Sequence, residues 1–188
     1  MSDEQEDTTY TLLSDEDRSK VKERLLAAHE HLFHGTPAAN LDSIRQHGLH
    51  PRFESVHSAY ANRDREPGAA IRYCIKNHPE LALSAAGNRS QEWDEAAERW
   101  VPVSPEIVIL RVKAAALLNR PFGLDHSFGE VAGEVESVLK SRHRLTPDDF
   151  VGLVEKYGSI SCYACIPPGE LEICTDAPPS LSGKFSKL

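Results

Sequence analysis

The side chains best suited to chemistry lie in residues 32–49, where a short apolar run ends in His34 and Gly35. A neutral imidazole at the tip of a strand can hold a hydroxyl group, because one ring nitrogen donates a hydrogen bond and the other accepts one. Gly35 lacks a Cβ atom, so a planar ligand could approach its backbone and bond the N–H and C=O groups. The pair indicates a ligand site; the alternative is a strand-end histidine whose ring bonds nearby backbone.

A strand and a helix must hold these residues in place. Thr36 can cap the helix, and Pro37 suits its first position because that backbone N–H would have no partner there. Three apolar residues then share one face of the helix: Ala38, Leu41 and Ile44. Gly48 offers a left-handed end, with Leu49 as its apolar contact. The sequence therefore predicts a strand, a polar turn and a well-capped helix.

A metal site is the competing explanation for the histidines near this turn. His31 and His34 would point to opposite faces of a strand, and His29 belongs to the preceding helix. No HExxH or comparable carboxylate spacing accompanies them. We therefore expect no metal.

The four cysteines are Cys74, Cys162, Cys165 and Cys174. Cys162 and Cys165 have a spacing that can bind zinc or do redox chemistry, but they lie in residues 160–166, which have the character of a strand. Residues three apart on a strand face opposite ways, and no helix follows as it would in a redox pair. We expect all four to be buried, reduced thiols.

Length and charge narrow the classes of function. The chain has 188 residues, which favours one domain, and its formal net charge of −8 argues against a nucleic acid as the main partner. The N-terminal residues lack the basic-then-apolar pattern of a signal peptide, and no run is long enough to span a membrane. The expectation is a cytoplasmic protein that binds neither nucleic acid nor membrane.

The other predicted helices and strands are interspersed along the chain and do not alternate as regular βαβ units. We expect helices over residues 14–30, 79–86, 91–100, 129–141 and 146–158. We expect strands over residues 31–34, 69–75, 105–112, 159–166 and 170–174, with a long loop or lid over residues 50–67. This order predicts an α+β fold with a mostly antiparallel sheet. A disordered acidic lead-in (residues 1–13), a single domain (14–175) and a loose tail (176–188) complete the expected layout.

The spaced motif Phe33-His34-Gly35-Thr36, then Asn40-Leu41, Ile44 and Gly48-Leu49, resembles the opening signature of ADP-ribosyltransferases of the His-Tyr-Glu class. That class includes poly(ADP-ribose) polymerase-like enzymes and bacterial toxins and effectors. The resemblance implies a split antiparallel sheet with flanking helices and NAD as co-substrate, with no metal. RNA 2′-phosphotransferases share the fold and have a similar opening.

The resemblance assigns roles to individual residues. His34 would bond a ribose hydroxyl of NAD, the Gly35 backbone would hold the nicotinamide amide, and Thr36 is the third motif position. Tyr73 would stack on the nicotinamide, with Tyr60 as the alternative. Apart from the motif, Arg52 and the loop arginines Arg63 and Arg65 are candidates to meet the pyrophosphate.

The sequence departs from the family at the glutamate. That residue would fall near Ser159 or Ser161, and neither is acidic. Glu155 is the expected catalytic replacement, with Glu170 and Glu172 as alternatives beyond the following turn.

The function implied is transfer of single ADP-ribose units from NAD to a macromolecular acceptor, expected to be a protein, in the cytoplasm or in a host cytosol. An inactive NAD or ADP-ribose binding module on the same fold is one alternative. RNA 2′-phosphotransferase chemistry is the other.

Overall fold

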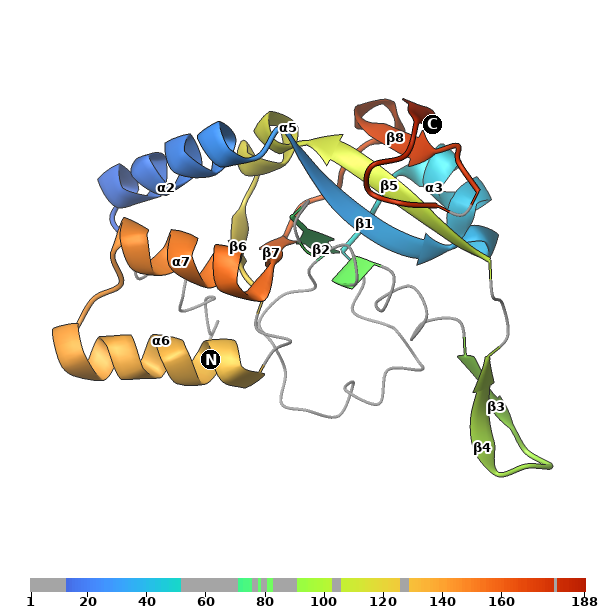
Figure 1. Cartoon of the computed structure of the whole chain (residues 1–188), viewed down its shortest axis with the longest axis horizontal. Helices are drawn as coiled ribbons and strands as arrows, with labels where there is room; N and C mark the ends of the chain where they lie inside the picture. Colours follow the sequence, from blue (N-terminus) through green and yellow to red (C-terminus); the bar gives the residue numbers. More distant parts are fainter. Residues whose placement is uncertain are drawn as a thin grey trace, which may run out of the picture.

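The computed structural model describes residues 13–51, 71–75, 78, 81–82, 91–102, 106–125, 129–177 and 179–188. It is an α+β structure in which a seven-stranded antiparallel sheet, with strand order β6-β7-β2-β1-β5-β8-β9, carries the helices (Figure 1). A separate hairpin, β3 and β4, extends from it. The coarse α+β prediction is confirmed. No helix among the described residues has both the length and the apolar character needed to cross a bilayer.

The helical segments are α2 (Asp15–Ala28), η1 (Ala38–Asn40), α3 (Leu41–His47), α5 (Ala114–Leu118), α6 (Gly129–Arg142), α7 (Pro147–Tyr157) and η2 (Pro168–Glu170). The strands are β1 (His31–Pro37), β2 (Ile71–Cys74), β3 (Gln91–Asp94), β4 (Arg99–Pro102), β5 (Ile107–Lys113), β6 (Phe122–Leu124), β7 (Ser159–Cys162), β8 (Leu171–Cys174) and β9 (Phe185–Lys187).

Strand β1 has unequal partners on its two sides. It pairs with β5 along its whole length, from His31↔Lys113 to Pro37↔Ile107. On the other side it pairs with β2 at Phe33↔Cys74 alone among the described residues. The described ladder between β1 and β2 therefore ends just before His34 and Gly35.

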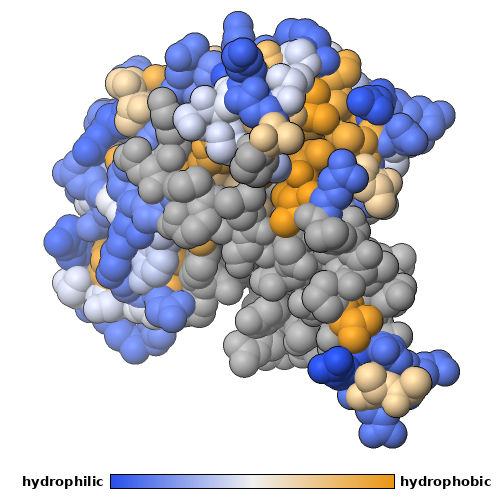
Figure 2. Space-filling view, turned by 45° about the vertical axis from the view of Figure 1, so that its right-hand side comes forward, coloured by the Kyte–Doolittle hydropathy of each residue, from blue (hydrophilic) through white to orange (hydrophobic). Residues whose placement is uncertain are grey.

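Side-chain alternation divides the sheet into two faces. Leu32, Tyr73 and Ile160 belong to a large buried cluster with side chains of α2, α5, α6 and α7, and we call this side the helical face. Phe33 and Cys74 belong to a smaller cluster on the opposite face, which also contains Ile109, Cys174 and Leu181. In Figure 2 most of the coloured surface is hydrophilic, and the most extensive apolar area lies at the upper right, with smaller apolar spots elsewhere.

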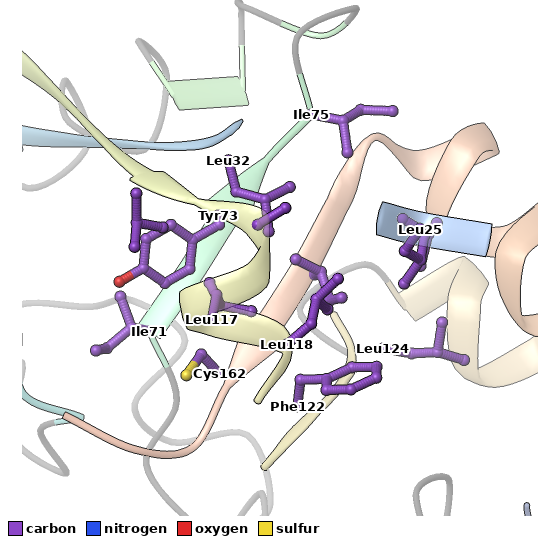
Figure 3. Close-up of a cluster of buried hydrophobic side chains, with 14 of the residues drawn as sticks. Leu25, Leu32, Ile71, Tyr73, Ile75, Leu117, Leu118, Phe122, Leu124 and Cys162 are labelled. Carbon is purple, nitrogen blue, oxygen red and sulfur yellow. The ribbon is translucent and has the colours of Figure 1, made fainter. Parts of the chain in front are cut away.

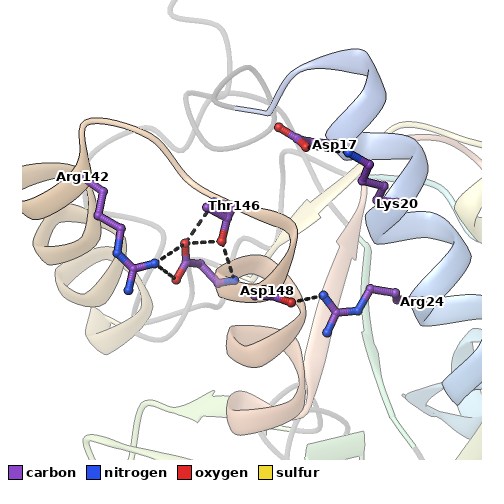
Figure 4. A network of polar contacts seen from close by, with 7 residues as sticks. Asp17, Lys20, Arg24, Arg142, Thr146 and Asp148 are labelled. Carbon is purple, nitrogen blue, oxygen red and sulfur yellow. Dashed lines mark hydrogen bonds and ion pairs between the residues drawn. The ribbon is translucent and has the colours of Figure 1, made fainter.

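Local capping chemistry fixes the starts of α2 and α7. Ser14 caps α2, and its side chain accepts a hydrogen bond from the Asp17 backbone. In α7 the Thr146 hydroxyl accepts from the Asp149 backbone while the Asp149 carboxylate accepts from the Thr146 backbone, which completes a capping box. Arg24 of α2 also bonds Asp148 in the first turn of α7, which joins the two helices (Figure 4).

The predicted turn after His34 differs from the structure in detail. Thr36 and Pro37 continue strand β1, and a short 3-10 turn precedes α3, so Thr36 does not cap the helix. The Thr36 hydroxyl instead accepts a hydrogen bond from the Asn40 amide at 3.1 Å. Gly48 does end α3, with φ of 80°, and Leu49 bridges to Ile166.

The helix predicted for residues 91–100 is wrong. These residues form the β3–β4 hairpin, in which Trp93 stands opposite Trp100. The Asp94 carboxylate accepts hydrogen bonds from the backbone N–H groups of Ala96 and Ala97, which closes the turn. Residues seven apart share a helical face, but they can equally lie opposite each other across a hairpin, so the spacing did not distinguish the two structures.

The expected chain ends also need correction. Leu13 is a buried core residue, and β9 in the tail pairs with β8, so the sheet extends beyond residue 175. The last long strand is shorter than predicted and ends at Cys162, while α5 and β6 were not predicted. Residues 1–12 and residues 52–67 of the expected lid lie outside the described residues. Of the helix predicted for residues 79–86, only Leu81 and Ala82 are described, and they are helical.

Gly48 is predicted to be indispensable to the fold. A Cβ atom there would lie 2.3 Å from the Ile166 carbonyl oxygen, and the positive φ disfavours any L side chain. We expect Gly48→Ala to lower the free energy of unfolding by about 2 kcal/mol or more, measured by urea denaturation.

Gly133 is the matched control, because it lies within α6 and a Cβ atom added there would meet nothing within 4 Å beyond its own helix backbone. Gly133→Ala should raise the free energy of unfolding by about 0.5–1 kcal/mol. Equal effects at the two glycines would contradict the role given to Gly48.

Candidate functional site

His34 and Tyr73 lie together on the helical face. The two rings have centroids 5.7 Å apart and are tilted by 51°. His34 stands opposite Leu110 in β5, and Tyr73 stands opposite Ile160 in β7, so both come from the middle of the sheet. The structure therefore brings together the two aromatic residues that the sequence singled out.

Both rings are buried. His34 is 5% exposed and Tyr73 1% exposed. The Tyr73 ring belongs to the apolar cluster that includes Ile71, Leu117 and Cys162 (Figure 3). A ligand could stack on Tyr73 only if neighbouring side chains moved aside.

The Tyr73 hydroxyl is an unusual feature of this core. Its oxygen is buried and has no hydrogen-bond partner among the described residues. Burial raises the pKa of Tyr73 well above its ordinary value, and the positive charge of Arg120 opposes that shift. The phenol is therefore protonated at neutral pH and has a free donor and a free acceptor to offer a ligand.

The backbone at Gly35 lies beside this pair. Gly35 is opposite Ile109 in β5, and no described residue of β2 pairs with its other edge. Thr36 is 2% exposed and bonded to Asn40, which fixes the backbone that follows. The other residues suggested for this site lie outside the described residues: Arg52, Tyr60, Arg63 and Arg65.

Glu155 is engaged elsewhere. Its Oε1 lies 2.7 Å from Nε2 of His29, which is itself buried. His29 also lies among apolar side chains, including those of Leu25 and Val154, where α2 meets α7. The structure thus gives Glu155 a partner in helix packing instead of placing it beside His34.

Glu172 is likewise held in an ion pair. Arg111 donates a hydrogen bond to its carboxylate at 2.7 Å, and Lys187 lies 3.6 Å away. The Arg111 hydrogen bond lowers the pKa of Glu172 below its ordinary value. Arg111 also lies over the ring of Phe185, which packs against the smaller cluster, so this pair belongs to the opposite face.

Glu170 differs from the other two glutamates. Arg120 donates a hydrogen bond to its Oε1 at 2.8 Å, but Oε2 is buried and has no partner among the described residues. Arg120 is fixed in turn by a hydrogen bond to the Ala116 carbonyl at the end of α5.

Sequence reasoning missed one buried acid, Asp125. It is 4% exposed, and the Ser159 hydroxyl donates to its carboxylate at 2.9 Å. Ser159 pairs with Cys74, so both belong to the opposite face from His34 and Tyr73. An acidic residue directly after the apolar β6 was the available signal, but only the fold shows that it meets Ser159.

The four cysteines are free thiols; Cys74, Cys162 and Cys174 are buried as expected, but Cys165 is only half-buried, which corrects the prediction for that residue. Cys162 is buried and donates to the Ala164 carbonyl, and burial raises the pKa of its thiol. Cys165 lies 3.4 Å from Nε2 of His50. Within the part of the chain that the structure describes, no three potential ligands gather into a metal site.

The unpartnered hydroxyl yields a stability prediction. We expect Tyr73→Phe to raise the free energy of unfolding by about 1 kcal/mol, because it removes a buried polar group that has no partner. Tyr157→Phe is the matched control: its hydroxyl donates to Glu134 at 2.6 Å, so stability should fall. Urea denaturation of both variants would measure this, and a loss of stability in Tyr73→Phe would contradict the assignment.

The position of Glu155 yields a second prediction. Glu155→Ala should lower the free energy of unfolding by about 1–3 kcal/mol, because His29 loses its partner inside the helix interface. The exposed Glu136, paired with Lys140, is the control, and Glu136→Ala should change stability by no more than about 0.5 kcal/mol. Calorimetric unfolding of both variants measures these changes. A loss of stability in Glu155→Ala no larger than that in Glu136→Ala would contradict the packing role of Glu155.

Comparisons of this chain with models of protein families, with curated proteins and with solved structures found no match. What the site does must therefore be argued from its own residues.

Proposed function

We propose that this chain is an NAD-dependent mono-ADP-ribosyltransferase that acts on a macromolecular acceptor, which we take to be a protein. The observation that carries the proposal is the contact between the His34 and Tyr73 rings on neighbouring strands, beside Gly35. These are the residues that the motif resemblance assigns to the nicotinamide and its ribose. The unpartnered Tyr73 hydroxyl supports the fit, since a bound ligand would satisfy it.

The proposed reaction requires the site to perform three tasks. Cleavage of the nicotinamide–ribose bond builds positive charge on the ribose, so the leaving amide must be fixed, the ribose oriented and the charge stabilised. The Gly35 backbone would fix the amide, and His34 would orient the ribose by a hydrogen bond. Tyr73 would provide the surface on which the nicotinamide ring stacks.

The acidic character of the chain bears on the acceptor. A net charge of −8 makes a nucleic acid an unfavourable acceptor, because phosphate recognition relies on clustered Lys and Arg. The same charge disfavours RNA 2′-phosphotransferase chemistry.

A catalytically inactive NAD-binding module is the second candidate. The observation in its favour is that Ser159 and Ser161, the positions where the family has its glutamate, carry hydroxyls, and that Ser159 is bonded to Asp125. Burial of His34 and Tyr73 adds to this case, because binding would then require local opening.

Titration calorimetry with NAD tests the binding half of the proposal. We expect His34→Ala to weaken NAD binding by about tenfold or more, since loss of a buried hydrogen bond to ligand costs at least about 1.4 kcal/mol. His143→Asn is the matched control, because this exposed histidine has φ of 59°, which asparagine tolerates.

Release of labelled nicotinamide tests the catalytic half. Turnover by the wild-type chain with attachment of labelled ADP-ribose to an acceptor supports the transferase. Binding without release supports the inactive module, and absence of binding contradicts both.

A further inference from the structure

Two buried side-chain oxygen atoms have no hydrogen-bond partner in the part of the chain that the structure describes. Among the described residues they are Tyr73 Oη and Glu170 Oε2. Arg120 donates to the other oxygen of Glu170, and its charge also acts on the Tyr73 phenol. Buried polar oxygens are normally hydrogen-bonded, so each of these two atoms is available to a polar ligand.

The elements around Arg120 keep this group on the helical face. Arg120 follows α5, whose Leu117 packs in the same buried cluster as Tyr73. Its guanidinium also acts on Cys162, which lies in β7 beside β2. Glu170 ends η2, immediately before β8. Leu171, which follows Glu170, packs in the same buried cluster as Tyr73. Glu170 thus belongs to a different segment from the one in which the family's glutamate would fall.

Arg120 fixes the Glu170 carboxylate while leaving one oxygen open. Its Nη1 bonds the Ala116 carbonyl and its Nη2 bonds Oε1 at 2.8 Å. The glutamate side chain is 36% exposed, but Oε2 itself is buried, so a ligand would reach this oxygen only after a local movement of the side chain. Hydrogen bonding to Glu170 raises the pKa of Arg120, so the cation persists at neutral pH.

The other acids do not offer this arrangement. Glu155 is paired with His29 in the α2–α7 interface, and Glu172 is paired with Arg111. Asp125 is paired with Ser159 on the opposite face.

We infer that Glu170 is the catalytic carboxylate of this site, with Arg120 as the residue that positions it. This inference rests on the proposed function. The bond between ribose C1′ and the nicotinamide nitrogen breaks, and its electron pair neutralises the pyridinium as nicotinamide leaves. The lone pair of the acceptor nucleophile forms the new bond to C1′, and the proton of the nucleophile passes to Glu170 Oε2.

Glu170→Gln is the sharpest test, because the amide oxygen can still accept the Arg120 hydrogen bond while the base is lost. We expect NAD affinity within about threefold of wild type and nicotinamide release slowed by about a hundredfold or more, as loss of a general base commonly produces. Glu172→Gln is the matched control, because it removes the charge of a second Arg-paired glutamate, and its rate should remain near that of wild type.

The outcomes separate this inference from the proposed function. Release by Glu170→Gln within about threefold of wild type would overturn the role of Glu170 and leave the transferase standing. Loss of NAD binding in Glu170→Gln, or an equal loss of rate in Glu172→Gln, would also overturn it. If the wild-type chain binds NAD without cleaving it, the catalytic role of Glu170 is overturned and the inactive NAD-binding module is supported. A chain that does not bind NAD removes both proposals.

Discussion

The unequal pairing of β1 is the constraint on which the candidate site depends. β1 is fixed to β5 along seven paired positions, while its described pairing with β2 ends at Phe33 and Cys74. Because β5 fixes the register, His34 must point to the same side as Leu32, toward Tyr73. Gly35 then lies beyond the last described pairing of β1 with β2. A one-residue shift of β1 would reverse the His34 side chain and dismantle the pair.

The acidic side chains lie in different parts of the fold and have different partners. On the opposite face Asp125 is satisfied by Ser159 and Glu172 by Arg111, and in the helix interface Glu155 is satisfied by His29. Glu170 alone among these retains a buried oxygen without a partner in the described structure. Whether a buried carboxylate oxygen already has a hydrogen-bond partner, more than position along the chain, distinguishes Glu170 from the other acids.

Features set by neighbouring residues were predictable from the sequence. The end of α3 at Gly48 and the helix expected over residues 146–158 need only local geometry, and both are confirmed. The interface role of Glu155 depends on His29, which is distant in the chain, so no local pattern indicated it. The pairing of β9 with β8 was missed for a similar reason: β9 is a short strand, and its own residues do not indicate which strand it pairs with. The hairpin at residues 91–102 was missed because its spacing of tryptophans also suits a helix.

The most direct test of the account is an NMR titration of the whole chain, labelled at its histidine and tyrosine rings, with NAD. Binding at the His34–Tyr73 pair predicts that the resonances of these two rings shift together and saturably, while the ring of the exposed His143 does not respond. Binding that leaves both rings unchanged, or no binding at all, would contradict the central claim that this pair holds the nicotinamide ribose.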